Sequence, residues 1–323
     1  MYKVIMAPTA GEDIEKPAIT LAVRLARKLD AELRLVRVET APVAVDPIPG
    51  KNPLTITERD WREARINRLH KLESLGVQCR ALGEIRVITA LEDGVVNPTL
   101  LAYAKRFNVD LIVMSSHLRG GLSRLTLGST ADYLIRNADI PVLIAKPSLL
   151  LNGDPFKTIG NMVVALDGSE LAEQIVPHVS MLAAKLGASV SLLRVLTPQN
   201  YAQQRIMQPG LPWWDADISE AYAYLATVAE NLGKEGIKVS TEVLLGDDVA
   251  RAILDYVTST PVDLLAVATS GAGGFKRLVF GSVADEVTRQ SPTSLLVFHA
   301  VDRSAESDVL ERREQPPLVP AIS

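Results

Sequence analysis

The sequence contains one cysteine, Cys79, and few aromatic residues, which make up 5% of its 323 positions. A single cysteine excludes an intrachain disulfide and any metal site built from several cysteines. Apolar residues still make up 47% of the chain, so valine, leucine, isoleucine and alanine must form the core. That bias is typical of helices packed on a buried parallel sheet. At this length we expect two domains rather than one.

Long apolar runs and a strong excess of one charge are also missing. No stretch is long and apolar enough to span a bilayer. A net charge of −4 predicts no bulk attraction to nucleic acid or to an anionic membrane. The opening residues, MYKVIMAPTAGEDIEK, have too short an apolar run for a signal peptide, and acidic residues follow that run. We therefore expect a soluble, cytoplasmic protein.

Spacings typical of metal sites and of hydrolases do not occur either. None of His70, His117, His178 and His299 lies at ligand spacing from another histidine or from the cysteine. No nucleophile elbow, paired-carboxylate motif or Ser-His-Asp order emerges. We therefore predict no catalytic residue and no metal bound by the protein. His178, which follows a proline in a predicted helix, is interpreted as structural.

The second half of the chain repeats the first. Residues 29–40, 109–116 and 127–146 recur as residues 186–197, 262–269 and 280–299. The first match has a spacing of 157 residues and the other two a spacing of 153, so the halves differ by small insertions or deletions in loops. A period of this size indicates a duplicated domain and not a solenoid.

Each half alternates short apolar runs with stretches of helical periodicity. The runs predict strands at residues 2–8, 32–38, 77–82, 110–115 and 141–145, and at 161–167, 189–195, 238–245, 263–269 and 293–298. Long helices are predicted over 57–76 and 217–236, each ending at a glycine, and Cys79 would be a buried strand residue. Strands separated by helices favour right-handed crossovers and a parallel, doubly wound α/β sheet in each half.

The predicted domains follow from this repeat. Residues 1–147 form the first domain, residues 148–160 a linker containing proline, glycine and asparagine, and residues 161–301 the second domain. The tail, residues 302–323, is charged and contains proline, so we expect it to be disordered.

A glycine-containing loop, SGAGGFKRLVFGSVAD at residues 270–285, follows the fourth predicted strand of the second half. Gly271 lies at the carboxyl end of a strand, where ligands bind in doubly wound sheets. Gly281 and Ser282 begin a predicted helix, whose free N–H groups and positive dipole end favour a phosphate. The same two residues are equally typical of a turn and a helix cap. Lys276 and Arg277 either counter phosphate charge or form a solvated face.

Three segments of the second half resemble the universal stress protein family, and the whole chain resembles its tandem form. They are VVALDGSELAEQ, LLRVLTP and ATSGAGGFKRLVFGSVAD. The resemblance implies two tandem doubly wound domains, each a five-stranded, mainly parallel sheet of order 3-2-1-4-5 flanked by helices. It also implies an ATP site in the family pattern Gly-x2-Gly-x9-Gly-Ser/Thr.

The resemblance assigns individual residues of the second half to that ATP site. Asp167, which otherwise reads as part of a helix-entry turn, would contact the adenosine end, and the backbone of Val195 would face adenine. Ala268 stands where the family has its first glycine, near the ribose. The complete predicted nucleotide site is Asp167, Gly168, Ser169, Val195, Ala268, Gly271, Gly281, Ser282 and Val283. Mg²⁺ is expected on the ATP phosphates.

The first half departs further from the family pattern. When the halves are aligned on Gly128, the two glycine positions hold Ser115 and Leu118, and Thr9 takes the aspartate position. A leucine brings bulk where the backbone should approach a phosphate. We therefore expect the first site to be weakened or lost.

The resemblance implies a stress-response protein that binds ATP and acts as a nucleotide-dependent sensor or regulator. Two alternatives stay open: slow ATP hydrolysis, for which no residue positioning a water can be named, and a nucleotide-free scaffold for dimerisation and protein contacts. We expect the halves to pack as a pseudo-dimer, and further self-association into a homo-oligomer is possible. Trp213 and Trp214 lie in a predicted proline-containing loop, where burial is favoured over contact with a nucleotide.

Overall fold

The computed structural model describes residues 2–11, 15–40, 58–115, 127–147, 159–197, 213–269 and 281–300. The elements of the first half are β1 (Val4–Pro8), α1 (Lys16–Leu29), β2 (Glu32–Glu39), α2 (Glu58–Gly83), β3 (Val87–Asp93), α3 (Val96–Arg106), β4 (Leu111–Ser115), α4 (Ser129–Asn137) and β5 (Val142–Ala145). Those of the second half are β6 (Asn161–Ala165), α5 (Glu170–Glu173), α6 (Val176–Leu186), β7 (Ser189–Leu196), α8 (Trp213–Lys234), β8 (Val239–Leu245), α9 (Val249–Ser259), β9 (Leu264–Thr269), α10 (Ser282–Gln290) and β10 (Ser294–His299).

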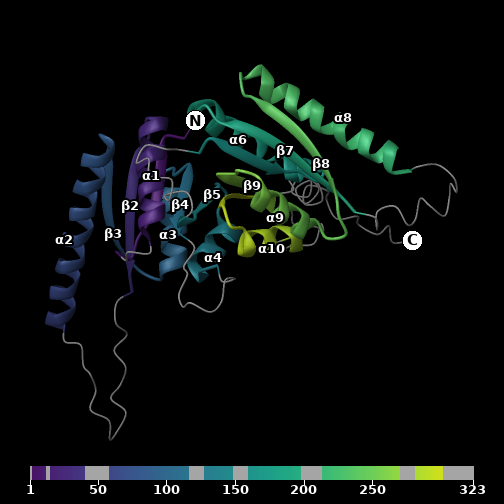
Figure 1. The fold of residues 1–323 in the computed structure, drawn as a ribbon. Helices are drawn as coiled ribbons and strands as arrows, with labels where there is room; N and C mark the ends of the chain where they lie inside the picture. The colour runs from purple at the N-terminus through teal and green to yellow at the C-terminus, as the bar shows by residue number, and fades with distance from the viewer. Residues whose placement is uncertain are drawn as a thin grey trace, which may run out of the picture.

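The two halves share one ten-stranded sheet of order β3-β2-β1-β4-β5-β10-β9-β6-β7-β8 (Figure 1). Within each half the strands are parallel and follow the order 3-2-1-4-5, so the predicted fold class is confirmed. The halves join where β5 pairs with β10 in antiparallel orientation, with Leu143 opposite Leu296. The edge strands β3 and β8 therefore lie at the two far ends, each beside a long helix, α2 or α8 (Figure 1).

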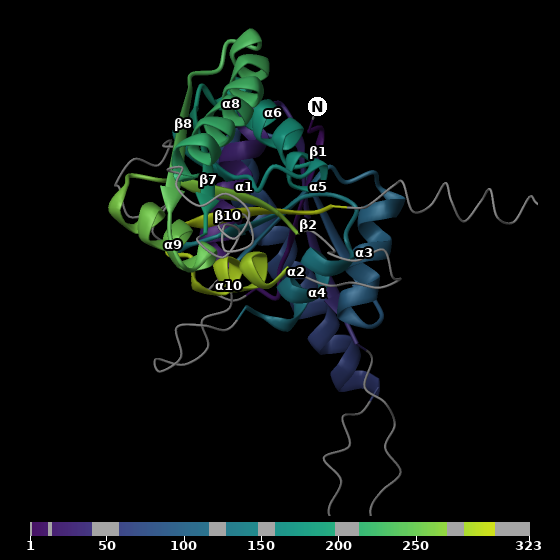
Figure 2. The same ribbon diagram turned by 90° about the vertical axis from the view of Figure 1, so that its right-hand side faces the viewer.

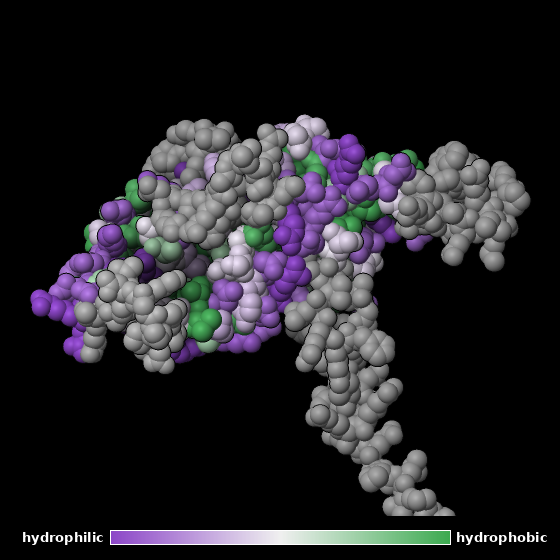
Figure 3. All heavy atoms as spheres, turned by 90° about the horizontal axis from the view of Figure 1, so that it is seen from below, coloured by the Kyte–Doolittle hydropathy of each residue, from purple (hydrophilic) through white to green (hydrophobic). Residues whose placement is uncertain are grey.

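Helices cover both faces of this sheet (Figure 2). Helices α1, α2, α6 and α8 pack into one hydrophobic cluster with the sheet, and α3, α4, α9 and α10 pack into a second. All five residues of β4 and all four of β5 are buried, as expected for strands covered on both sides. Both clusters contain residues of both halves, so the core is continuous across the junction. Seen from below, the described surface is mainly hydrophilic, with hydrophobic residues in small separate groups (Figure 3).

The prediction of a third strand at residues 77–82 was wrong. Helix α2 continues through Gly76 to Gly83, and the strand is β3 instead. A Cβ at Gly76 would lie 2.6 Å from Cγ2 of Thr89, so this glycine lets the helix lie close against β3 and does not end it. Cys79 is accordingly a buried helix residue, and burial raises the pKa of its thiol to about 11.

The expected loop at Trp213 and Trp214 is also corrected, because α8 begins at Trp213 and both residues lie in its first turn. Their side chains lie outside the described part of the structure, as do residues 148–158 of the predicted linker and the tail from residue 301 onward.

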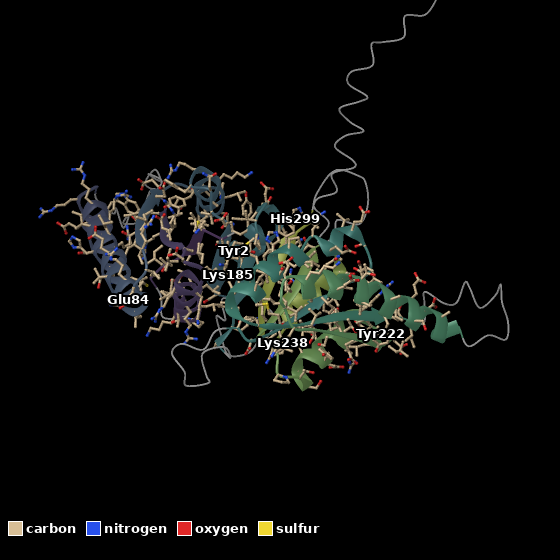
Figure 4. The ribbon with its side chains drawn as sticks, turned by 90° about the horizontal axis from the view of Figure 1, so that it is seen from above. Tyr2, Glu84, Lys185, Tyr222, Lys238 and His299 are labelled. Carbon is tan, nitrogen blue, oxygen red and sulfur yellow. The ribbon has the colours of Figure 1, made fainter. Side chains whose placement is uncertain are left out.

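Polar contacts reinforce the junction between the halves. The hydroxyl of Tyr2, from the first half, lies 3.1 Å from Nδ1 of His178 in α6 (Figure 4 labels Tyr2). The His178 ring also packs on Phe298 at a centroid distance of 4.6 Å, and burial lowers the pKa of this histidine. The prediction that His178 is structural agrees with this environment.

An ion-pair quartet, consisting of Asp132, Arg136, Asp285 and Arg289, joins α4 to α10. Arg136 bonds Asp132 in its own helix twice at 3.0 Å and reaches Asp285 of the other half at 3.2 Å. Arg289 bonds Asp285 at 2.9 and 3.0 Å and lies 3.7 Å from Asp132. The quartet has internal two-fold pseudosymmetry, because each half contributes one aspartate and one arginine at equivalent positions.

Candidate functional site

A cleft of about 420 Å³ opens at the carboxyl ends of β6, β7 and β9 in the second half. This is the edge of a doubly wound sheet at which ligands bind. Six of the nine predicted site residues line the cleft: Asp167, Val195, Ala268, Gly281, Ser282 and Val283. Val249 and Ile253 of α9 and Val267 of β9 add apolar walls. Gly271 lies outside the described residues.

The remaining two predicted residues, Gly168 and Ser169, form the turn that follows Asp167. Gly168 has a φ of +91°, and a Cβ there would lie 3.2 Å from the Arg194 guanidinium, so both conformation and space favour glycine. Ser169 caps α5, because its Oγ accepts a hydrogen bond of 3.1 Å from the N–H of Ala172. The helix-entry turn considered from the sequence is therefore present at this point.

Asp167 is exposed at the mouth of the cleft. Its Oδ1 accepts a hydrogen bond of 2.8 Å from the N–H of Ser169, which fixes the side chain in the turn. Among the described residues, no group donates a hydrogen bond to Oδ2. One carboxylate oxygen is therefore held by the protein and the other is available to a ligand hydroxyl or amino group.

Arg194 and Tyr224 are two further residues at this site that the sequence analysis missed. Arg194 lines the cleft, and its guanidinium carbon lies 5.3 Å from the centre of the Tyr224 ring. Burial raises the pKa of Tyr224, and the nearby carboxylates of Glu173 and Asp167 raise it further, so the phenol stays protonated. The sequence signal that could have identified Arg194 is an arginine at the same place in the second strand of both halves, Arg37 and Arg194.

The N-terminus of α10 closes the cleft on its other side. Gly281 is the N-cap, and the N–H of Asp285 bonds the Gly281 carbonyl at 2.8 Å as the first turn begins. The N–H groups of Ser282, Val283 and Ala284 precede that first bond and have no intrahelical acceptor. Such a helix start binds anions through its N–H groups and the positive end of its dipole.

Asp285 places a negative charge in the same first turn. Hydrogen bonding to Arg289 lowers the pKa of Asp285, and the charge of Arg136 from the first half lowers it further. Both arginines therefore offset a carboxylate that would otherwise oppose an anion at this helix start.

The first half has an equivalent but smaller cleft of about 140 Å³. Val96, Leu100, Met114, Ser115 and Thr130 line it, at positions 153 residues before the corresponding lining residues of the second cleft. Oγ of Ser115 is buried and finds no hydrogen-bond partner in the described part of the chain. A cavity of this size has room for water, which would satisfy that hydroxyl.

The prediction that Thr9 takes the aspartate position was wrong. Strand register pairs Val4 with Glu32 and, in the second half, Asn161 with Ser189, so the spacing between the halves is 157 residues along β1 and β6. The equivalent of Asp167 is therefore Ala10, and Thr9 corresponds to Leu166.

Backbone hydrogen bonds agree with this register. The N–H of Thr9 bonds the carbonyl of Val36 at 2.9 Å, and the N–H of Leu166 bonds the equivalent carbonyl of Leu193 at the same distance.

The described residues contain no group of three or more histidine, cysteine, aspartate or glutamate side chains able to hold a metal ion. Nδ1 of His299 lies 3.0 Å from Oγ1 of Thr269, and burial lowers the pKa of this histidine (Figure 4 labels His299).

None of the helices within the described ranges is long and apolar enough to cross a membrane.

The family model described as the universal stress protein family matches residues 1–146 and again residues 158–299. A universal stress protein of Mycobacterium tuberculosis is 26% identical over 315 residues, covering 91% of this chain and 98% of the relative. One from Methanocaldococcus jannaschii is 30% identical over 149 residues, covering 45% of this chain and 83% of the relative. The crystal structure of a universal stress protein from Archaeoglobus fulgidus has a TM-score of 0.66 at 18% identity, covering 93% of this chain and 99% of that chain.

Proposed function

Because the chain belongs to the universal stress protein family, we propose that its second half binds ATP and that the protein acts as a nucleotide-dependent sensor or regulator in a stress response. The observation that carries this proposal is the second cleft, where an available carboxylate oxygen and a helix N-terminus face the same space. Its volume of about 420 Å³ lies in the range typical of small-molecule sites.

The two ends of the cleft suit the two ends of a nucleotide. Asp167 can accept hydrogen bonds from ribose hydroxyls or from an adenine amino group, and the apolar side chains of Val195 and Val267 can pack against a planar base. The N–H groups at the start of α10 would receive the phosphates. Gly271, predicted from the sequence to belong to the phosphate site, lies outside the described residues. Ala268 adds one methyl group to the floor between these ends.

Mg²⁺ would accompany ATP on the phosphates. This ion usually keeps several waters and binds through substrate phosphates with few protein ligands, so it needs no carboxylate cluster of its own. The Ser282 hydroxyl, at the predicted phosphate end of the cleft, is a protein oxygen that could contribute.

A regulatory role follows if ATP favours one arrangement of α10 over another, because a ligand shifts an equilibrium only by its differential affinity for the two states. The ion-pair quartet links helix α10 to the first half, so a movement of the N-terminus of α10 would alter contacts across the junction. We also propose the division into domains at residues 1–147 and 161–301, a cytoplasmic location and self-association into a homo-oligomer.

Calorimetric titration with ATP, with and without Mg²⁺, tests this function. Wild-type protein should bind one equivalent, and Gly271→Leu should bind far more weakly because bulk would enter the phosphate loop. Gly233→Leu is the matched control, since a Cβ built at Gly233 in α8 meets no described atom within 4 Å beyond its neighbours and its own helix backbone. Absence of binding by the wild type would favour the scaffold, and steady phosphate release abolished by Gly271→Leu would favour an ATPase.

A further inference from the structure

The two clefts differ in the position of a carboxylate. In the second half it belongs to Asp167, and the position five residues later is Ala172. In the first half the equivalent of Asp167 is Ala10, and five residues later stands Glu15. Each cleft thus has one carboxylate at these two positions. The second half has it at the first position, as Asp167, and the first half has it at the second position, as Glu15.

The chain itself satisfies Glu15. Its Oε1 accepts a hydrogen bond of 2.8 Å from the N–H of Ala10. Its Oε2 accepts bonds of 2.6 Å from the Thr9 hydroxyl and 3.1 Å from the N–H of Gly11. The residue is only 7% exposed, although it lines the cleft. These three donors, all from the described residues, and the burial of the carboxylate form a stable arrangement that any ligand would have to disrupt.

Asp167 presents the opposite situation. It is exposed, one oxygen is held by Ser169, and the other has no donor in the described part of the chain. At the position of Glu15, the methyl side chain of Ala172 leaves space, and the second cleft is about 420 Å³ against about 140 Å³ for the first. Glu15 also borders a separate cavity of about 510 Å³ between α1 and α2. The larger Met114, in place of Val267, narrows the first cleft further.

We infer that Glu15 closes the first cleft from within, as an internal ligand of the turn between β1 and α1, and that the exchange of Glu15 for Ala172 decides which half accepts a nucleotide. The turn N–H groups of the first half are already bonded to a carboxylate, and the buried Glu15 side chain fills the space that Ala172 leaves open in the second cleft. This inference rests on the proposed function for its consequence in the second half, but the closure itself is a property of the first half alone.

Hydrogen exchange tests the closure without any nucleotide. In the wild type, the amides of Ala10 and Gly11 should be protected, and Glu15→Ala should speed the exchange of Ala10 by roughly tenfold or more, because its acceptor is lost. The acceleration at Gly11 should be smaller, because its N–H also bonds Oγ1 of Thr9 at 3.0 Å. Exchange in the equivalent second-half turn, at Asp167 and Gly168, should not change. If Glu15→Ala does not fold, Glu15→Gln, which keeps one acceptor oxygen, should give a smaller acceleration. Fast exchange of both amides in the wild type would overturn the inference.

Placing a glutamate at position 172 tests whether the exchange of Glu15 for Ala172 decides which half accepts a nucleotide. Ala172→Glu should lower ATP affinity in the second half by roughly 100-fold, since a long charged side chain would enter the cleft beside Asp167. Ala226→Glu, the same substitution at an exposed position of α8, should bind as the wild type does. Urea denaturation of both variants establishes that they are folded.

The outcomes separate this inference from the proposed function. If the wild type binds ATP and Ala172→Glu binds it equally well, the inference is overturned and the proposed function stands. If the wild type binds no ATP, the proposed function fails, and the exchange of Ala10 and Gly11 still decides whether Glu15 closes the first cleft.

Discussion

Replacing Asp167 by asparagine separates its role in the turn from its role in binding. The asparagine Oδ1 can still accept the 2.8 Å hydrogen bond from the N–H of Ser169, so the turn should keep its shape. The other oxygen becomes an amino group, which donates where the carboxylate would accept from a nucleoside. The expected result is a folded protein with weakened ATP binding.

The size of this effect follows from the hydrogen bond that is lost. A hydrogen bond to a charged group contributes about 1.5–3 kcal/mol, which corresponds to a loss of affinity of about 10- to 150-fold. Because Asp167 is exposed and solvent screens its charge, we expect the lower end, about 10- to 30-fold. The free energy of unfolding should change by less than about 0.5 kcal/mol, as for most exposed substitutions.

Calorimetric titration with ATP and urea denaturation measure the two quantities on the same samples. Asp255→Asn is the matched control, because Asp255 is a 78% exposed aspartate in α9 that does not line the cleft. An Asp167→Asn protein that is folded and binds ATP within twofold of the wild type would refute the assignment of Asp167 to the nucleoside end.

Four further predictions concern stability, each measured by urea denaturation. Arg136→Gln should lower the free energy of unfolding by about 1 kcal/mol, less in high salt, and an equal loss at all salt concentrations would contradict an ion-pair origin. The guanidinium groups of Arg289 and Arg136 lower the pKa of Asp285. The contribution of this carboxylate to the free energy of unfolding should therefore be present above about pH 4 and be lost as pH falls through the lowered pKa. Burial lowers the pKa of His178, so the contribution of this residue to the free energy of unfolding should be complete above about pH 6.5 and decline below it. His178→Phe should remove this pH dependence, and an unchanged profile would be evidence against burial of a neutral ring. Gly76→Leu should cost about 1–3 kcal/mol through contact with Thr89, and full stability would mean that α2 does not lie close to β3.

Nine of the ten strands were predictable because their signals are local and repeated, whereas the strand order was expected only from the family resemblance. Buried parallel strands give short continuous apolar runs, and those runs appear twice in the same order. The sequence predicted that the halves pack as a pseudo-dimer, but it did not predict that β5 and β10 join them into one sheet. Antiparallel pairing of two edge strands leaves no periodic signal in either strand.

The error at α2 shows where a local rule loses to tertiary packing. Glycine often ends a helix, but Gly76 is required by the closeness of Thr89 across the helix–sheet interface. Residues 77–82 then read as a strand because their apolar residues alternate, whereas in the structure they continue the helix and bury Cys79.

The family resemblance assigned most of the residues that line the cleft, and their positions after strands are consistent with it, because those strand ends meet at one edge of the sheet. The role of Glu15 was missed because a glutamate at the start of a helix is typical of favourable interaction with the helix dipole and does not indicate a cleft residue. A strict alignment at the 157-residue spacing from Val4 onward would have placed Glu15 opposite Ala172 and Ala10 opposite Asp167.

The most direct test of an asymmetric nucleotide site is a crystal structure of the protein grown with a non-hydrolysable ATP analogue. We expect electron density for one nucleotide, with its nucleoside at Asp167 and its phosphates at the N-terminus of α10, and none beside Glu15. A nucleotide bound in the first cleft, or a second cleft without nucleotide at saturating analogue, would contradict this account.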